Sequence, residues 1–196
     1  MRTDWHALEF TRTRGWEARD RSDDELADFV GLAAWCERRG IIAASLARHY
    51  RRYAGVHPAQ ARAARRDAQA LRALIYRVLC RAGACRPPTS EQLREVNEWL
   101  VRFTGARQLA RSAGEIRWDL RLDPADPDQL LAPIVWSLAE LLTAPEFSRV
   151  RRCEADDCGW LFIDASRARS RRWCTMSDCG NLAKVRAFRA RQQVAG

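Results

Sequence analysis

The sequence has no apolar run long enough to cross a membrane, because a spanning helix needs about 18 or more consecutive apolar residues. The longest candidate covers residues 130–142, and it contains Ser137 and Glu140. The first residues lack the apolar segment of a secretory signal peptide. We therefore expect a cytoplasmic protein with no membrane attachment.

Signatures of common enzyme classes are missing as well. The sequence contains no nucleophile elbow, no phosphate-binding P-loop and no glycine-rich dinucleotide fingerprint. The three histidines, His6, His49 and His57, show no metal-ligand spacing with one another. We do not expect an enzyme.

Lysine is almost absent, since Lys184 is the only lysine among 34 basic residues. With so much alanine, the choice of arginine over lysine fits a GC-rich genome and is less informative than the sign of the charge. The formal net charge is +9, which is typical of proteins that bind an acidic partner, most often nucleic acid. Residues 150–196 hold ten basic and five acidic residues, so more than half of the excess charge lies in the last quarter.

Cysteine is sparse over most of the chain, but four cysteines gather near its C-terminus. Cys153 and Cys158 are separated by four residues, as are Cys174 and Cys179, and fifteen residues separate the two pairs. This spacing predicts a tetrahedral Zn²⁺ site, and four sulfur ligands would leave no open position for substrate, so the ion would be structural. The alternative is two disulfides, which would need an oxidising compartment.

The other three cysteines allow two interpretations. Cys80 and Cys85 repeat the four-residue spacing, but their one spare cysteine partner, Cys36, lies on the apolar stripe of a predicted helix. We interpret all three as buried or incidental thiols, with a redox pair as the alternative.

The first three quarters of the chain read as mostly helical. A capping box of Ser22 and Glu25 predicts a helix that ends near Gly40, and a shorter helix should cover residues 42–53. A long helix should begin at Pro58, with an apolar face repeating every three or four residues: Ala61, Ala64, Ala68, Leu71, Ile75 and Val78.

The pattern changes after residue 88. Thr89 and Gln92 form a second capping box before a helix, and residues 105–122 predict a short β-hairpin. An apolar helix should then cover residues 128–143. A short connection over residues 147–152 predicts that this helical part touches the C-terminal residues, 147–196, which we call the cysteine module.

The cysteine module is too short to fold on apolar burial alone, so zinc would supply the missing folding free energy, on the order of 10 kcal/mol. Trp160, Phe162 and Trp173 should pack around the metal. Residues 159–164 predict a strand, and Asn181 should begin a helix with Leu182, Val185 and Phe188 on one face.

Basic side chains of the module predict a phosphate-binding surface, because guanidinium groups bind phosphate in a bidentate manner. A solvated basic tail is the alternative. The predicted nucleic-acid contacts are Arg167, Arg169, Arg171, Arg172, Asn181, Lys184, Arg186 and Arg189.

The same segment resembles the CGNR-type zinc finger. The resemblance rests on the two cysteine pairs, the stretch Cys158-Gly-Trp-Leu-Phe-Ile-Asp164 and the sequence Cys179-Gly-Asn. Upstream, Ala7-Leu-Glu-Phe10, Thr13, the helix before Gly40 and the hairpin around Trp118 look like the ABATE-type domain that usually precedes this finger. The resemblance implies a stress-related bacterial transcription regulator, with zinc bound by Cys153, Cys158, Cys174 and Cys179.

Two positions depart from that family's pattern. Leu182 stands where the finger usually has arginine, which removes one DNA contact if that arginine makes one. Arg12 stands where the N-terminal domain usually has asparagine, which would alter a ligand pocket if the asparagine lines one.

We therefore expect a mainly α fold with a small β-hairpin, comprising a helical domain over residues 1–146 and a four-cysteine zinc finger over residues 147–196. The expected function is zinc-dependent DNA binding in transcription regulation, with the first domain sensing a signal or mediating oligomerisation. A homodimer and a small-molecule ligand of the first domain are compatible with this reading. The alternatives are a protein-interaction module shaped by zinc and a thiol redox or small-molecule sensor.

Overall fold

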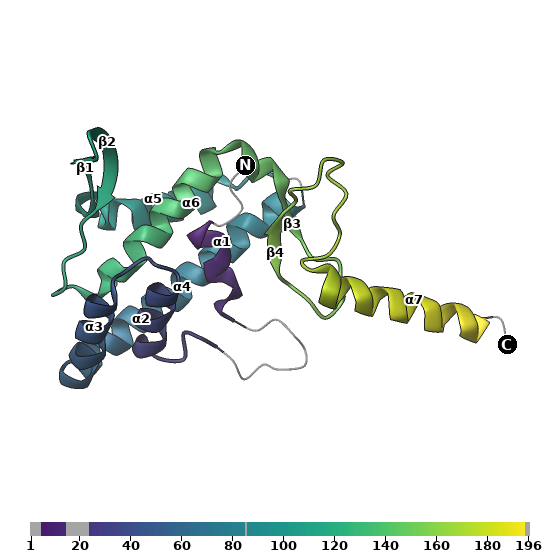
Figure 1. Ribbon diagram of the computed structural model, residues 1–196, viewed down its shortest axis with the longest axis horizontal. Coiled ribbons are helices and arrows are strands. Elements are labelled where there is room, and N and C mark those ends of the chain that lie inside the picture. Colours follow the sequence, from purple (N-terminus) through teal and green to yellow (C-terminus); the bar gives the residue numbers. More distant parts are fainter. Residues whose placement is uncertain (1–4, 15–23, 85, 195–196) are drawn as a thin grey trace.

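The computed structural model describes residues 5–14, 24–84 and 86–194, and it confirms a mainly α-helical fold with a small hairpin. A helical body carries the hairpin β1–β2 at one end and the cysteine module at the other (Figure 1). The helices of the body are α1 (His6–Phe10), α2 (Phe29–Arg38), α3 (Ala44–Val56), α4 (Pro58–Gly83), α5 (Ser90–Arg102) and α6 (Ala132–Thr143). No helix in the described ranges is long and apolar enough to span a membrane.

Helix α4 forms the centre of the body. Its first residue is Pro58, whose fixed φ suits a helix start. Every residue of the predicted apolar face of α4 is buried, which confirms the periodicity seen in the sequence. The same core contains Phe10 and Trp35 in an edge-to-face contact and the apolar side of α6.

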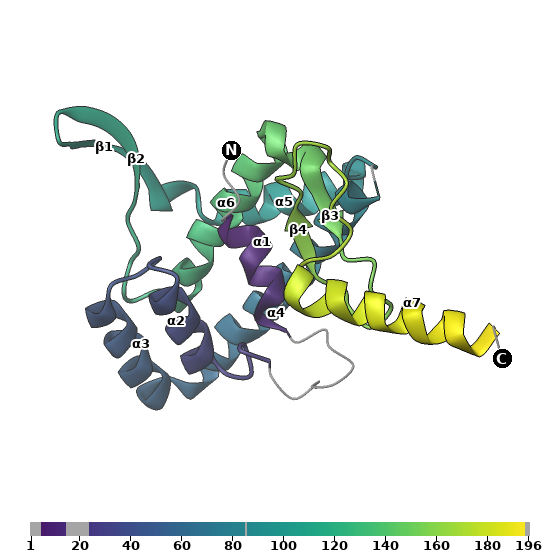
Figure 2. The same cartoon turned by 45° about the vertical axis from the view of Figure 1, so that its right-hand side comes forward.

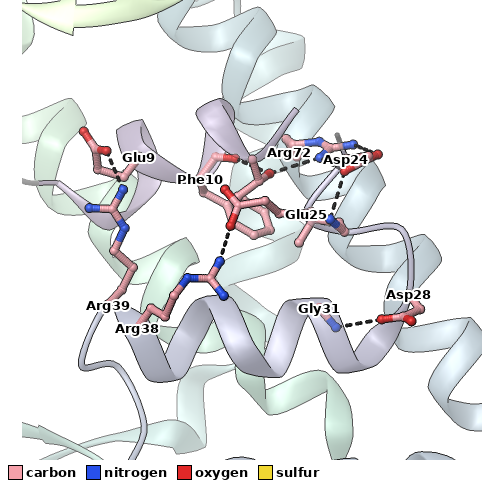
Figure 3. Close-up of polar contacts among 11 residues, drawn as sticks. Glu9, Phe10, Asp24, Glu25, Asp28, Gly31, Arg38, Arg39 and Arg72 are labelled. Carbon is pink, nitrogen blue, oxygen red and sulfur yellow. Dashed lines mark hydrogen bonds and ion pairs between the residues drawn. The ribbon is translucent and has the colours of Figure 1, made fainter. Parts of the chain in front are cut away.

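Helix α2 begins later than the sequence predicted. The carboxylate of Asp28 accepts a hydrogen bond from the Gly31 amide at 2.7 Å, so Asp28 is the N-cap (Figure 3). Glu25 pairs with Arg38 instead of closing a capping box, and Ser22 lies outside the described residues. The helix ends as predicted, with Gly40 at a φ of +66° that favours glycine.

The predicted elements after residue 88 are present. Thr89 and Gln92 form a capping box at the start of α5. Strands β1 (Arg107–Ser112) and β2 (Glu115–Leu120) pair antiparallel through a two-residue turn, and both turn residues, Ala113 and Gly114, have positive φ. A 3₁₀ turn (Pro127–Leu131) precedes α6, so this apolar helix begins four residues later than expected.

A second small hairpin joins the cysteine module to the body. Strand β3 (Val150–Arg152) pairs antiparallel with β4 (Leu161–Ile163), and β3 was not predicted. Val150, Leu161 and Ile163 belong to the main core, whereas Phe162 points to the other side and packs with the cysteines. Because successive side chains of a strand point to opposite sides, this one hairpin contributes to both the core of the body and the core around the cysteines.

Helix α7 (Asn181–Val194) ends the described chain and points away from the body in two views (Figures 1 and 2). Its predicted apolar face is largely uncovered, since Val185 is 48% exposed and Phe188 is 55% exposed.

Candidate metal centre and nucleic-acid interface

The four cysteines of the predicted metal site converge on one point. Their sulfur atoms all lie within 4.8 Å of one another, and each of the four residues is buried. The Sγ atoms of Cys158 and Cys174 are 3.8 Å apart, and those of Cys174 and Cys179 are 3.5 Å apart. Zn–S bonds of about 2.3 Å in a tetrahedron separate sulfur atoms by about 3.8 Å. The donor set therefore fits one structural zinc ion.

Local backbone contacts bring the two cysteine pairs together. Cys153 follows β3, and its amide donates to the Trp160 carbonyl at 2.9 Å, which closes the first loop. The Glu154 amide donates to the Arg172 carbonyl at 3.0 Å and links the first loop to the second pair. A side chain at Gly180 would place its Cβ only 2.5 Å from the Trp173 ring, so this turn into α7 needs glycine.

Proton affinity differs among the clustered thiols. Hydrogen bonding from Cys158 lowers the pKa of Cys174 to about 5, whereas burial and the bond to Cys174 raise the pKa of Cys179 to about 12. The first thiolate therefore forms readily, and its negative charge opposes the next one. A divalent cation would compensate that charge and allow four thiolates.

Asp164 organises the arginine-rich loop between the cysteine pairs. It is fully buried at the end of β4. One of its carboxylate oxygens accepts from the Ser166 amide at 2.9 Å and from the Ser166 hydroxyl at 2.6 Å, and the other accepts from the Arg171 amide at 3.0 Å. Burial raises the pKa of this carboxyl, but these hydrogen bonds outweigh burial, and the pKa lies below its ordinary value.

Three arginines among the predicted nucleic-acid contacts are engaged within the module. Arg171 lies 4.8 Å over the Phe162 ring and donates to the carbonyls of Trp173 and Cys174. Arg172 pairs with Glu154 at 2.6 Å, and Arg186 pairs with Asp157 at 2.8 Å. These guanidinium groups help to hold the module in shape.

Four other predicted contacts are exposed to solvent. Arg167 and Arg169 lie on the loop that Asp164 organises, and Arg169 has a left-handed φ of 52°. Lys184 and Arg189 lie on α7, at whose first residue Asn181 donates its side-chain amide to the Ser177 carbonyl at 3.2 Å. The structure thus brings loop cations and helix cations onto the same module.

The side chains of Arg12 and Tyr76 in the body donate hydrogen bonds to the module, and the sequence did not reveal these contacts. The Arg12 guanidinium donates to the Leu161 carbonyl at 2.9 Å and lies 5.5 Å from the centre of the Trp160 ring. The Tyr76 hydroxyl donates to the Gly159 carbonyl at 3.1 Å. The one signal in the sequence was the departure from the family pattern at Arg12.

The remaining cysteines show no second metal centre among the residues that the structure describes. Cys36 is buried in the main core, and burial raises its pKa to about 12, as expected for an inert thiol. Cys80 is half-buried. Cys85 lies outside the described ranges, so the suggested redox pair is untested.

Comparison with family models agrees with the resemblance drawn from the sequence. The model for the CGNR zinc finger matches residues 149–192. The ABATE model, described as "Putative stress-induced transcription regulator", matches residues 6–145. Neither description names a catalytic activity. No curated protein matches the chain.

Proposed function

The chain belongs to the ABATE family, and we propose that it is a zinc-dependent DNA-binding protein that regulates transcription. In this proposal residues 147–196 bind DNA, and residues 1–146 sense a signal or mediate oligomerisation. The observation that supports it most is the exposure of loop and helix cations on a zinc-organised module whose helix α7 points away from the body (Figure 2).

The exposed cations would make the phosphate contacts. Arg167 and Arg169 would bind from the loop, and Lys184 and Arg189 from α7, which would enter the major groove if it reads base edges. The main role of three other arginines, Arg171, Arg172 and Arg186, would be to stabilise the conformation of the module. Asn181 would lie at the start of α7, the helix proposed to contact base edges. This division follows from their internal hydrogen bonds and ion pairs.

Zinc would be held by Cys153, Cys158, Cys174 and Cys179 and would supply folding free energy rather than reactivity. The residues around the zinc site hold the rest of the module in its conformation. Asp164 fixes the loop, and the Glu154–Arg172 contacts join the two halves of the module.

The proposal is tested by mixing the zinc-loaded protein with a pool of genomic DNA fragments near physiological salt and sequencing what it retains. We expect enrichment of a defined site. The double variant Arg167→Gln/Arg169→Gln should bind that site more weakly, and the slope of log affinity against log salt should fall by about 1.8 if two phosphate contacts are lost.

A matched control removes two exposed arginines of the body, Arg62→Gln/Arg66→Gln on α4, and should leave both affinity and slope unchanged. Absence of any retained DNA would contradict the proposal.

A protein-interaction module is the second candidate, and the exposed apolar side chains of α7 and Met176 favour it. It predicts partner capture that tolerates high salt and depends on Val185 and Phe188. Replacing both residues with serine would then abolish binding of the partner protein. DNA binding through phosphate contacts would change little in the same variant.

A further inference from the structure

A charged cavity of about 600 Å³ lies on the body beside the cysteine module. It is bounded by α4 and by the segment that follows α1, including the 3₁₀ turn η1 (Thr11–Thr13). Three guanidinium groups and one carboxylate line it: Arg14, Arg72, Arg77 and Asp24. Ala73 and the Tyr76 ring supply apolar surface, so the lining combines cations with a wall suited to an organic group.

Arg72 is fixed in place at the inner side of this cavity. It is only 8% exposed and binds the two carboxylate oxygens of Asp24 at 2.5 and 2.8 Å (Figure 3). A third bond goes to the Thr13 hydroxyl at 3.0 Å. Since a guanidinium has five N–H groups, the structure leaves two donors of Arg72 without a partner among the described residues.

The other two cations have donors to offer. The Arg14 side chain makes no hydrogen bond to any residue that the structure describes, although its charge favours the ionised form of Asp24. Arg77 is half-exposed and uses one nitrogen to bind Glu95 at 2.7 Å. Arg72 is therefore held rigidly by its neighbours, while Arg14 and Arg77 can turn toward a ligand.

The cavity is connected to the metal centre through one side chain. Tyr76 lines the cavity, and its hydroxyl donates to the carbonyl of Gly159, the residue that follows the zinc ligand Cys158. A molecule packed against the Tyr76 ring would therefore press on the cysteine loop directly.

We propose that this cavity binds a small phosphate-bearing molecule and transmits its presence to the zinc module through Tyr76. The inference rests on the proposed function, in which the helical domain senses a signal. Guanidinium groups bind phosphate in bidentate geometry, and the cavity is larger than a phosphate alone requires, so an organic part would lie on Tyr76.

A second cavity fits this role less well. It measures about 410 Å³ and lies between the β1–β2 hairpin and α6. Arg107 in its lining is already stacked between Trp118 and Trp136 and pairs with Glu140 at 2.6 Å. Because the Arg107 guanidinium already binds these neighbours, it is less suited than the arginines of the first cavity to bind a phosphate.

The binding step is tested with inorganic phosphate as the probe, titrated into the full-length zinc-loaded protein against sodium chloride of equal ionic strength. We expect a saturable rise in Tm and a binding isotherm by calorimetry. The variant Arg14→Gln/Arg77→Gln should bind phosphate about tenfold more weakly, and it leaves the Arg72–Asp24 pair intact.

Two matched variants make the test specific. Arg48→Gln/Arg52→Gln removes two exposed cations of α3, which does not line the cavity, and should bind phosphate like the wild type. Absence of saturable binding to the wild type would overturn the proposal. The proposal would also be overturned if Arg167→Gln/Arg169→Gln lost phosphate binding and Arg14→Gln/Arg77→Gln kept it. Phosphate would then bind at the proposed DNA-binding surface.

The transmission step has its own measurement, the rate at which zinc passes to a chromogenic chelator. Phosphate should slow this transfer in the wild type. In Tyr76→Phe phosphate should still raise Tm but should no longer change the transfer rate, and an unchanged phosphate effect would overturn the role of Tyr76. Neither step involves DNA, so failure of DNA binding would leave both results standing.

Discussion

At the scale of single residues, carboxylates such as the half-buried Asp24 and the fully buried Asp164 determine how several arginines of this protein are used. An arginine count of this size predicts a basic surface, yet the structure divides the described guanidinium groups into those that bind carboxylates or carbonyls, several of which are still exposed, and those with no such partner among the described residues. Asp24 holds Arg72 in the body, and Asp164 holds the backbone of the arginine-rich loop. The sequence could not make most of this division, because pairs such as Arg72 with Asp24 and Arg172 with Glu154 join different segments of the chain. Arg94 and Glu98 on α5 are an exception, since they lie four residues apart on one helix.

Asp164→Asn should weaken DNA binding although Asp164 is buried and is not itself a proposed DNA contact. The amide replaces one acceptor oxygen by a donor, so the bonds from Ser166 and Arg171 cannot all persist, at a cost of about 2 kcal/mol in the free energy of unfolding. Arg167 and Arg169 would then lose their fixed positions. Urea unfolding and DNA titration measure the two effects, and the exposed Asp178→Asn serves as the control. A variant with normal stability and affinity would refute the role given to Asp164.

The Asp24 carboxyl should titrate below its ordinary pKa of about 3.9. Burial raises this pKa, but hydrogen bonds from Arg72 and the Leu26 amide lower it further than burial raises it. The carboxylate therefore stabilises the fold fully above the unfolded pKa, and this contribution is lost as pH falls through the lower folded pKa. An NMR titration of the Asp24 carboxyl carbon measures the midpoint directly, and a midpoint above 4 would contradict the assignment.

Asp24→Asn extends the same argument to neutral pH. It leaves the nearly buried Arg72 without its counter-charge, so we expect a loss of about 3 kcal/mol in the free energy of unfolding at pH 7. The difference between variant and wild type should shrink as pH falls.

At the scale of elements, short sequence patterns correctly predicted the helices and the hairpin that such patterns specify. The capping box at Thr89 and the β1–β2 hairpin were confirmed, because their stabilising contacts join residues that are close together in the chain. The apolar face of α4 was confirmed because its spacing of three or four residues is a local pattern, although the face packs against distant segments. The start of α2 was misplaced because the Asp28 carboxylate accepts the hydrogen bond from the Gly31 amide and caps the helix there. Strand β3 was missed because three residues carry no periodicity and because its partner strand, Leu161–Ile163, lies beyond the first cysteine loop.

The contact between α4 and β3 depends on a glycine. A Cβ at Gly83 would meet the Arg152 amide nitrogen at 3.0 Å, whereas a Cβ at Gly55 on α3 would meet nothing within 4 Å. Alanine favours a helix over glycine by about 1 kcal/mol. Gly55→Ala should therefore stabilise the protein, and Gly83→Ala should destabilise it by about 1 kcal/mol because the clash exceeds that gain.

Urea unfolding followed by tryptophan fluorescence compares the two alanine variants. The opposite signs are the essential result. Equal stabilisation by both substitutions would show that β3 can move away from α4 at no cost.

At the scale of the whole molecule, the metal centre and the helical body have separate cores that one hairpin joins. The convergence of the four cysteines could be predicted from their spacing, because two close pairs joined by a short loop are typical of a zinc site. The attachment of the module could not, because Arg12 and Leu161 are 149 residues apart in the chain and Tyr76 and Gly159 are 83 residues apart. The same hairpin places Phe162 among the cysteines and Leu161 and Ile163 among the residues of the body.

Removing zinc should therefore weaken the body as well as the module. Without the metal the β3–β4 hairpin loses its support, and the side chains of Val150, Leu161 and Ile163 no longer cover the main core, which should cost several kcal/mol at about 1.5–3 kcal/mol for each fully exposed side chain. We expect chelation, and likewise Cys174→Ser, to lower Tm and to speed hydrogen exchange at the C-terminal half of α4. Cys80→Ser, which changes a half-buried thiol outside the metal cluster, should keep zinc and the protection of α4. Unchanged exchange in α4 after complete metal removal would show instead that the module and the body are stabilised independently.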